Sequence, residues 1–299
     1  MNSSFRDIKN PRFDSVKLTL RILTSRYTGL IGLVIILVYF SIALIVEFTP
    51  SLIGLTDPNI MVPNFANPYP LPPSSTFPLG TTYPGINLLS ASLKAVRIDV
   101  YASLLVIISS AAIGSFLGVI AGYSRGLFDT VIMRVTDVFF SIPFLVLALA
   151  VGFAIGRTLN DILLALIIVH WPIFARLTRS QTLSLREENF VIYSKLAGNG
   201  PVKTVLKHLL PNTFTPVLVQ ISLSVASVVI ILASLYFIGF ASTNPYLPEL
   251  GALISIGFPY ALSSPWVVVV PGLFLMVYAL GMNMLGDGLR DALDPKNRT

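Results

Sequence analysis

The 299-residue chain contains no cysteine and only two histidines, and 11% of its residues are charged. Without cysteine, disulfides, thiolate metal ligands and a cysteine nucleophile are excluded. So few charges, beside 54% hydrophobic residues and a mean hydropathy of +0.80, fall outside the range of a soluble domain of this length. The composition therefore indicates a membrane protein.

Motifs for nucleotide binding and for common hydrolytic reactions are also missing. No GxxxxGK[ST] loop occurs, and the nearest look-alike, residues 198–204, has the wrong spacing. HExxH, GxSxG and paired intramembrane aspartates are absent as well. We therefore expect a chain that is not an enzyme, that binds no metal or cofactor and that does not itself hydrolyse ATP.

Ionisable groups are scarce inside the apolar stretches. A transporter driven by its own ion gradient usually needs such groups, although each costs about 2.5 to 3.5 kcal/mol at the membrane centre. Asp99, Asp137 and Asp287 fall near the ends of apolar stretches, and only His170 is central. We expect His170 to be a packing residue and the energy for moving a solute to come from outside the chain. A stand-alone secondary transporter or channel and an intramembrane enzyme are the competing classes.

What the sequence does contain is a series of apolar stretches, each near the 20 or so residues that a helix needs to cross a membrane. They predict an all-α polytopic membrane protein with six transmembrane helices. The first is expected at 28–48, and the others at about 100–123, 131–155, 159–178, 216–240 and 266–285. The remaining ranges are an amino-terminal segment (1–27), a proline-rich loop (49–97), a five-helix core (98–287) that contains polar segments at 185–211 and 241–265, and a tail (288–299).

The second apolar stretch carries small residues every four positions, at Ser110, Gly114, Gly118 and Gly122. On a helix these four positions share one face. Small residues at this spacing let a neighbouring helix approach closely, which drives helix association in lipid. We favour a packing stripe over a smooth pore wall.

The basic residues indicate the orientation in the membrane. Six helices place both ends of the chain on one side, and all but three of the 20 Lys and Arg residues fall on that side. The exceptions are Lys94, Arg97 and Arg157. Because cytoplasmic loops are enriched in Lys and Arg, both termini and the segment 185–211 are predicted to be cytoplasmic.

The segment 185–211 is the longest polar, basic stretch between two apolar ones. It predicts a helix over 186–197, with Glu187 and Glu188 in its first turn and Gly198 as the residue that ends it. A second short helix is expected to begin at Pro201 and to be stopped by Pro211. Its apolar face would comprise Val202, Val205, Leu206 and Leu209, and its opposite face Lys203, Thr204, Lys207 and His208. The segment either lies on anionic headgroups or docks a soluble partner.

Several longer motifs occur along the chain: FPLGTTYPGINLLS at 77–90, AGY at 121–123, RxTD at 134–137 with Ile142-Pro143, WPxxARLxRxQxLSLRxExFV at 171–191 and NxLGDGLRDALDPK at 283–296. These motifs resemble the inner-membrane permease subunits of binding-protein-dependent ABC importers, in the oligopeptide, dipeptide and nickel group, and more closely the C-type permease of the pair. In addition, Gly198 followed by His208 and Leu-Pro resembles the cytoplasmic EAA loop of that family.

This resemblance implies the type I importer permease fold in the plasma membrane of a prokaryote. It also implies a second, homologous permease subunit, two cytoplasmic ATPase subunits that bind ATP and Mg, and an external solute-binding protein. Membrane lipid is an expected partner and nucleic acid is not. The solute implied is a peptide, with oligosaccharide or nickel as alternatives.

The resemblance also assigns candidate residues. Docking of the ATPase is expected at Glu187, Glu188, Phe190, Tyr193, Lys195, Leu196, Ala197, Gly198, Asn199, Gly200 and Pro201. For the translocation path we consider one face of the fifth helix, where packing by small residues is the alternative interpretation. Its residues are Gln220, Ser224, Ser227 and Ser234.

The chain departs from the family pattern at three places. Ile192, Tyr193 and Ser194 replace the Glu-Ala-Ala triplet that names the loop. Leu232 stands where the family has an acidic residue in the fifth helix. The segment that leads into the second helix lacks the usual His, acidic residue and Arg-Asp pair, and has Phe77, Thr82, Ile86 and Asn87 instead.

Overall fold

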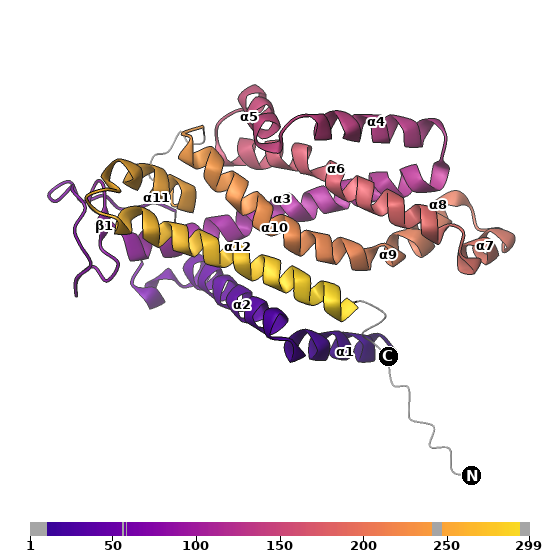
Figure 1. Ribbon diagram of the computed structural model, residues 1–299, viewed down its shortest axis with the longest axis horizontal. Helices are drawn as coiled ribbons and strands as arrows, with labels where there is room; N and C mark the ends of the chain where they lie inside the picture. The colour runs from indigo at the N-terminus through magenta and orange to yellow at the C-terminus, as the bar shows by residue number, and fades with distance from the viewer. Residues whose placement is uncertain (1–10, 56, 58, 241–246, 294–299) are drawn as a thin grey trace, which may run out of the picture.

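The computed structural model describes residues 11–55, 57, 59–240 and 247–293, and these form an elongated bundle of helices (Figure 1). Within these residues, five helices are long and apolar enough to cross a membrane. They are Tyr27–Phe48 (α2), Leu88–Ser124 (α3), Leu159–Leu185 (α6), Phe214–Phe237 (α10) and Trp266–Leu293 (α12). Together with a sixth, bent segment they confirm the predicted all-α polytopic architecture.

The sixth segment corrects the prediction of a single helix at 131–155. Leu127–Ser141 (α4) and Phe144–Ile155 (α5) meet at an angle of 102°. The break falls at Ile142 and Pro143, where the backbone is extended. The helix breaks here because a proline disfavours helical geometry in the residue before it. The bend was not predicted because the whole stretch is apolar.

The small-residue stripe on α3 packs against α6, as predicted. A Cβ atom added to Gly114 would lie 2.8 Å from the Cβ of Phe174, and one added to Gly122 would lie 2.8 Å from the Cβ of Thr182. Between them, a Cβ on Gly118 would overlap the hydroxyl of Thr178. Because the two helices approach so closely, α3 and α6 form the rigid centre of the bundle.

Three helices are longer than predicted, and one of them, α6, continues to Leu185 instead of ending near residue 178. The second transmembrane helix begins at Leu88 rather than near residue 100, since Asn87 caps it by accepting hydrogen bonds from the amides of Leu89 (3.0 Å) and Ser90 (3.4 Å). At about 1.5 Å per residue, the 37 residues of α3 extend for about 55 Å, well beyond the hydrocarbon core. The last helix continues to Leu293, so residues 288–293 of the predicted tail are helical.

The proline-rich loop folds into a small cap over one end of the bundle. It contains a 3-10 turn, Pro50–Ile53 (η1), and an antiparallel pair, Thr81–Thr82 (β1) with Ile86–Asn87 (β2). The indole of Trp266 at the start of α12 donates a hydrogen bond to the carbonyl of Thr81 (3.3 Å). Met61 and Ile86 bury their side chains against Leu250 and Leu253, so the cap is attached by apolar packing.

The predicted loop at 241–265 contains a helix that the sequence analysis missed. Leu250–Gly257 (α11) is followed by the 3-10 turn Phe258–Tyr260 (η3), while residues 241–246 lie outside the described part of the chain. Glu249 caps α11 by accepting a hydrogen bond from the amide of Ala252 (2.7 Å). A Cβ on Gly251 would lie 2.5 Å from the Cα of Ala233 in α10, so α11 is wedged tightly against the bundle.

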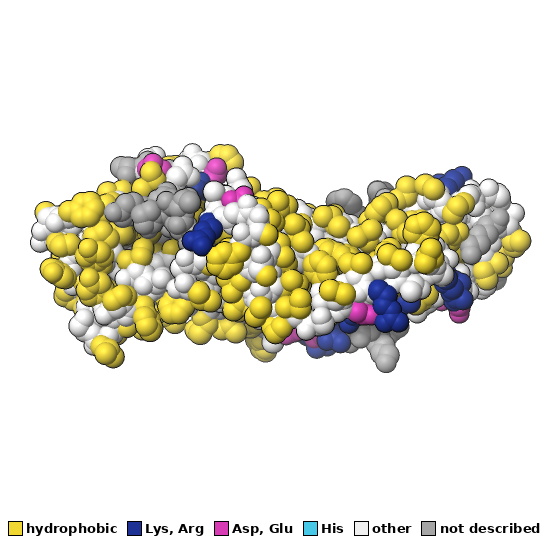
Figure 2. Space-filling model, turned by 90° about the horizontal axis from the view of Figure 1, so that it is seen from above, with side chains coloured by type: hydrophobic (Ala, Val, Ile, Leu, Met, Phe, Trp, Pro, Cys, Tyr) yellow, Lys and Arg dark blue, Asp and Glu magenta, His cyan; other side chains and the backbone are white. Residues whose placement is uncertain are grey.

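The opposite end of the bundle carries Pro11–Ser25 (α1) and the last turns of α12 (Figure 1). Arg26 and Asp291 form an ion pair there (2.8 Å), and Gly29 faces Gly288 across a close contact. The face shown in Figure 2 is hydrophobic over most of its length, with Lys and Arg side chains gathered mainly at the end that carries Asn189–Leu196 (α7).

Candidate functional site

The polar segment after α6 begins with a turn rather than with a helix. The prediction of a helix over 186–197 was wrong at its start, because α6 continues to Leu185 and α7 begins at Asn189. Glu187 and Glu188 lie in the connecting turn, which is closed by a hydrogen bond from the amide of Glu188 to the carbonyl of Leu185 (3.1 Å). Glu187 pairs with Arg125 (3.1 Å), the residue directly after α3.

The end of α7 is as predicted. Gly198 has a φ of 76°, a conformation that favours glycine. The amide of Asn199 reaches back to the carbonyl of Ser194 (3.2 Å), which is the hydrogen bond of a glycine-ended helix cap. A second bond runs from Asn199 Nδ2 to Ser194 Oγ (3.1 Å), so the glycine turn is held from both sides.

The second short helix differs from the prediction. It consists of Pro201–Thr204 (α8), a π turn at Val205–Leu209 (η2) and Leu210–Asn212 (α9), and therefore continues past Pro211. The wider π turn comes just before this proline, whose ring and missing N–H would disrupt a regular α-helical turn.

The predicted apolar face of this helix is only half right. Val205 and Leu209 are buried, but Val202 and Leu206 are exposed, and Thr204 from the predicted polar face is fully buried. Contacts with α3 determine which side of the helix is buried, and a helical pattern cannot reveal them.

A small apolar cluster attaches the segment to the bundle. Val191 from α7 and Val205 and Leu209 from η2 pack around Val119, near the end of α3. Arg186 adds a hydrogen bond from its guanidinium to the carbonyl of Gly122 (3.3 Å). Displacement of α7 would therefore be transmitted directly to α3 and α6.

The other side of α7 projects from the end of the molecule (Figure 1). Tyr193 is 66% exposed and Leu196 77% exposed, and Phe190 and Ile192 are also open to solvent. With Val202 of α8, these apolar side chains form what we call the α7 surface. Beside it, a groove of about 250 Å³ runs between α3 and α8 and is lined by Phe116, Ile120, Val202 and Leu206 among others.

A second feature lies at the opposite end of the bundle and was not predicted from the sequence. Asp99 is 1% exposed and Glu249 is fully buried, and their carboxyl groups interact directly. The placement of Asp99 near a helix end was wrong because α3 begins at Leu88, eleven residues earlier. No sequence signal joined the pair, since it forms only when α11 packs beside α3.

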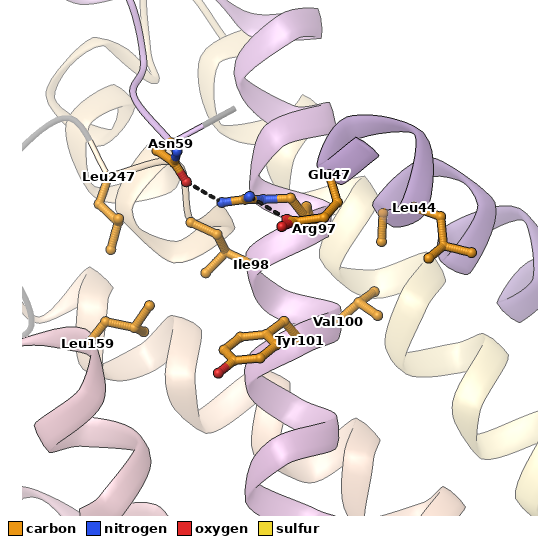
Figure 3. A pocket seen from close by; sticks show the side chains of 10 residues that line it. Leu44, Glu47, Asn59, Arg97, Ile98, Val100, Tyr101, Leu159 and Leu247 are labelled. Atoms are coloured by element: carbon orange, nitrogen blue, oxygen red, sulfur yellow. Dashed lines mark hydrogen bonds and ion pairs between the residues drawn. The ribbon is translucent and has the colours of Figure 1, made fainter. Parts of the chain in front are cut away.

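Close to this pair lies an apolar pocket of about 560 Å³ between α2, α3 and the start of α6 (Figure 3). Tyr101, Leu44 and Leu159 contribute to its wall. At its rim, the guanidinium of Arg97 pairs with Glu47 (2.5 Å) and with Asn59 (2.7 Å).

Comparison with known proteins decides the family. Residues 114–299 match the family described as "Binding-protein-dependent transport system inner membrane component". The chain belongs to this family. It is a multi-pass protein of the plasma membrane and has the fold class of the type I permeases.

Relatives of this permease carry consistent names. A dipeptide transport system permease protein of Alkalihalophilus pseudofirmus is 34% identical over 91% of this chain and 86% of its own length. A probable D,D-dipeptide transport system permease protein of Escherichia coli is 35% identical over 98% of this chain and 96% of its own length. A glutathione transport system permease protein of Pectobacterium atrosepticum is 35% identical over 75% of this chain and 74% of its own length. These are names of transport subunits rather than of enzymes.

The candidate docking residues of the permease lie together around the turn at Gly198. Most of them are exposed, and Asn199 is half-buried because it bonds Ser194. The side chain of Lys195 lies outside the described part of the structure. The exposed members are Glu187, Glu188, Phe190, Tyr193, Leu196, Ala197, Gly198, Gly200 and Pro201.

The candidate path residues on α10 differ in their surroundings. Gln220 donates a hydrogen bond to the buried hydroxyl of Ser224 (3.0 Å), which is a packing contact. Ser227 is exposed, and Ser234 is half-buried with its hydroxyl bonded to the carbonyl of Ile230 (2.7 Å). The translocation path therefore stays a prediction, and the exposed Ser227 is a better candidate for it than the buried Ser224.

Proposed function

We propose that this chain is one of two permease subunits that together form the translocation pathway of an ATP-driven peptide importer. Family membership and the dipeptide and glutathione transport names of its relatives support this proposal. The single observation that carries it is the α7 surface. Tyr193 and Leu196 expose apolar area on a short helix that is packed rigidly onto α3.

In this proposal the α7 surface binds an ATPase subunit, which holds the ATP and Mg. A second ATPase subunit binds the partner permease. When the ATPases close around nucleotide, they displace α7, and the contact of Val191 and Leu209 with Val119 passes the displacement to α3. The permease then switches between a state open to the cytoplasm and a state open to the outside, and the ATPase subunits determine which of the two is favoured.

The orientation follows from the distribution of basic residues. The end with α1 and α7 faces the cytoplasm, where Lys and Arg are enriched. The opposite end, with the β1–β2 hairpin and α11, faces outward and receives the solute-binding protein. That end carries only Lys94, Arg97 and Arg157 among the Lys and Arg residues of the chain.

Docking is tested by co-purification of the ATPase subunits with the permease. Tyr193→Asp and Leu196→Asp each place a charge in the α7 surface, and both should lower recovery of the ATPases severalfold without lowering membrane insertion. Leu262→Asp is the matched control, since Leu262 is fully exposed at the opposite end. Undiminished recovery with both α7 variants would refute the docking proposal.

The substrate class is tested on the binding protein that serves this permease. Titration with di- and tripeptides is expected to give saturable binding, and peptides are expected to compete with one another for import. Saturation by nickel or by an oligosaccharide, with no response to peptides, would replace the peptide assignment and leave the importer assignment intact.

A further inference from the structure

Asp99 and Glu249 place two carboxyl groups side by side in the interior of the bundle. Asp99 lies on α3 and Glu249 directly precedes α11, and neither side chain has appreciable contact with solvent. Asp99 faces Glu249 and the backbone amide of Leu250. Glu249 uses one carboxyl oxygen to cap α11, while its Oε1 and both carboxyl oxygens of Asp99 are shielded from solvent and have no hydrogen-bond partner within the described residues.

Among the described residues, the side chains that approach the pair from other helices carry no positive charge. They are the phenols of Tyr39 on α2, Tyr236 on α10 and Tyr278 on α12. Tyr39 donates its hydroxyl proton to the carbonyl of Phe274 (2.7 Å), and Tyr278 shares a hydrogen bond with Ser103 (3.0 Å). The hydroxyl of Tyr236 is buried beside the two acids and has no hydrogen-bond partner in the described part of the chain.

The nearest basic residues on α3 are directed elsewhere. Lys94 donates from Nζ to the carbonyl of Ile60 (3.0 Å), in the cap. Arg97 is directed to Glu47 and Asn59 at the rim of the apolar pocket (Figure 3). Neither cation therefore neutralises the acid pair.

Two adjacent buried carboxylates cannot both keep their charge, because desolvation and mutual repulsion add. A metal ion is a poor alternative, since no third Asp, Glu, His or Cys joins the pair in the described residues. A proton, in contrast, needs no cavity, and the carboxyl group that binds it can donate a hydrogen bond to the other carboxylate. We propose that Asp99 and Glu249 form a single-proton binding site that holds α11 against α3 when the proton is bound.

It follows from this proposal that the packing of α11 against α3 depends on pH. Burial raises the pKa of the Glu249 carboxyl to about 7. While the pair holds its shared proton, α11 stays packed beside α3. As pH rises through that range the proton is lost, the two charges repel, and the packed arrangement becomes less stable than one that admits water.

Cysteine labelling tests this directly, because the chain has no cysteine of its own. Ala95→Cys is the reporter, since Ala95 lies one turn before Asp99, is fully buried and packs in the cluster with Leu250 and Leu253. Leu253→Cys is a second reporter that removes volume instead of adding it. Ser263→Cys, at an exposed position, corrects for the ionisation of the thiol itself.

The assay uses a water-soluble maleimide on the full chain in membranes, with pH varied from about 6 to 8 around the raised pKa of a buried carboxyl. After correction by the exposed thiol, labelling of the buried reporter should rise with pH, by up to about tenfold per pH unit if one proton controls opening. With Asp99→Asn and Glu249→Gln combined, the corrected profile should be flat.

Two results would overturn the proposal. One is a flat corrected profile with the native acids, and the other is an unchanged rise when both acids are replaced by amides. Glu249→Gln alone preserves an oxygen for the α11 cap, so it serves if the double variant does not fold. The measurement needs neither ATP nor a partner subunit, so its failure is distinct from failure of the importer assignment.

Discussion

Asn199 is joined to Ser194 twice, through its backbone amide to the serine carbonyl (3.2 Å) and through Nδ2 to the serine hydroxyl (3.1 Å). These bonds close the turn at Gly198, which separates α7 from α8. Ser194 occupies the last position of the triplet by which the chain departs from its family's loop. The turn is therefore stabilised although the triplet is replaced, and the hydroxyl of Ser194 accepts one of the two hydrogen bonds that close it.

The first prediction concerns this pair. Asn199→Ala should destabilise the turn by about 0.5 to 1.5 kcal/mol, because it removes the side-chain hydrogen bond and keeps the backbone one. Hydrogen exchange of the α7 amides measures the change. In a Ser194→Ala background the same substitution should have little further effect, and full additivity of the two changes would contradict a direct interaction.

The second prediction concerns the stripe on α3. Gly118→Ala should lower the stability of the purified permease by about 1 to 3 kcal/mol, because the new methyl group would overlap the hydroxyl of Thr178. Gly272→Ala on α12 is the matched control, since a Cβ there meets no atom within 4 Å. The thermal unfolding midpoint measures both, and equal midpoints would show that α3 and α6 are less closely packed than described.

The third prediction concerns the ion pair at the rim of the apolar pocket. Glu47→Gln should cost less than about 1 kcal/mol, since the Glu47 side chain is 51% exposed and water screens the pair. Arg97→Gln should cost more, because Arg97 is 15% exposed and also bonds Asn59 of the cap. Limited proteolysis of the cap compares the two, and equal protection in both variants would refute the ranking.

Composition and helical spacing were sufficient to predict the number of apolar segments, the packing role of Gly114 and Gly118, and the turn at Gly198. Each of these depends on local properties: hydrophobicity, side-chain size and the backbone freedom of glycine. The same local reasoning placed the first transmembrane helix at 28–48, within one residue of α2.

Features that depend on contacts between distant segments could not be predicted in this way. The burial of Asp99 requires α11, which lies some 150 residues further along the chain. The exposure of Val202 and Leu206 depends on which side of the second short helix meets α3. The bend before Phe144 had a local signal in Pro143, but the apolar composition of the whole stretch concealed it.

In our proposal, α7 and α8 transmit the conformational change driven by ATP hydrolysis to the membrane helices, and this requires the fixed backbone geometry of the turn at Gly198. The most direct measurement is the amount of solute imported per ATP hydrolysed by the assembled importer, for Gly198→Val against Gly54→Val. Both glycines have a positive φ and open space around a new Cβ, so a β-branched residue costs about 1 to 2 kcal/mol at either position. Only Gly198 lies in the turn between α7 and α8, whereas Gly54 lies in the cap at the opposite end.

We predict that Gly198→Val inserts into the membrane and allows hydrolysis, but imports severalfold less solute per ATP, while Gly54→Val matches the unsubstituted permease. Equal import per ATP in the two variants would contradict the claim.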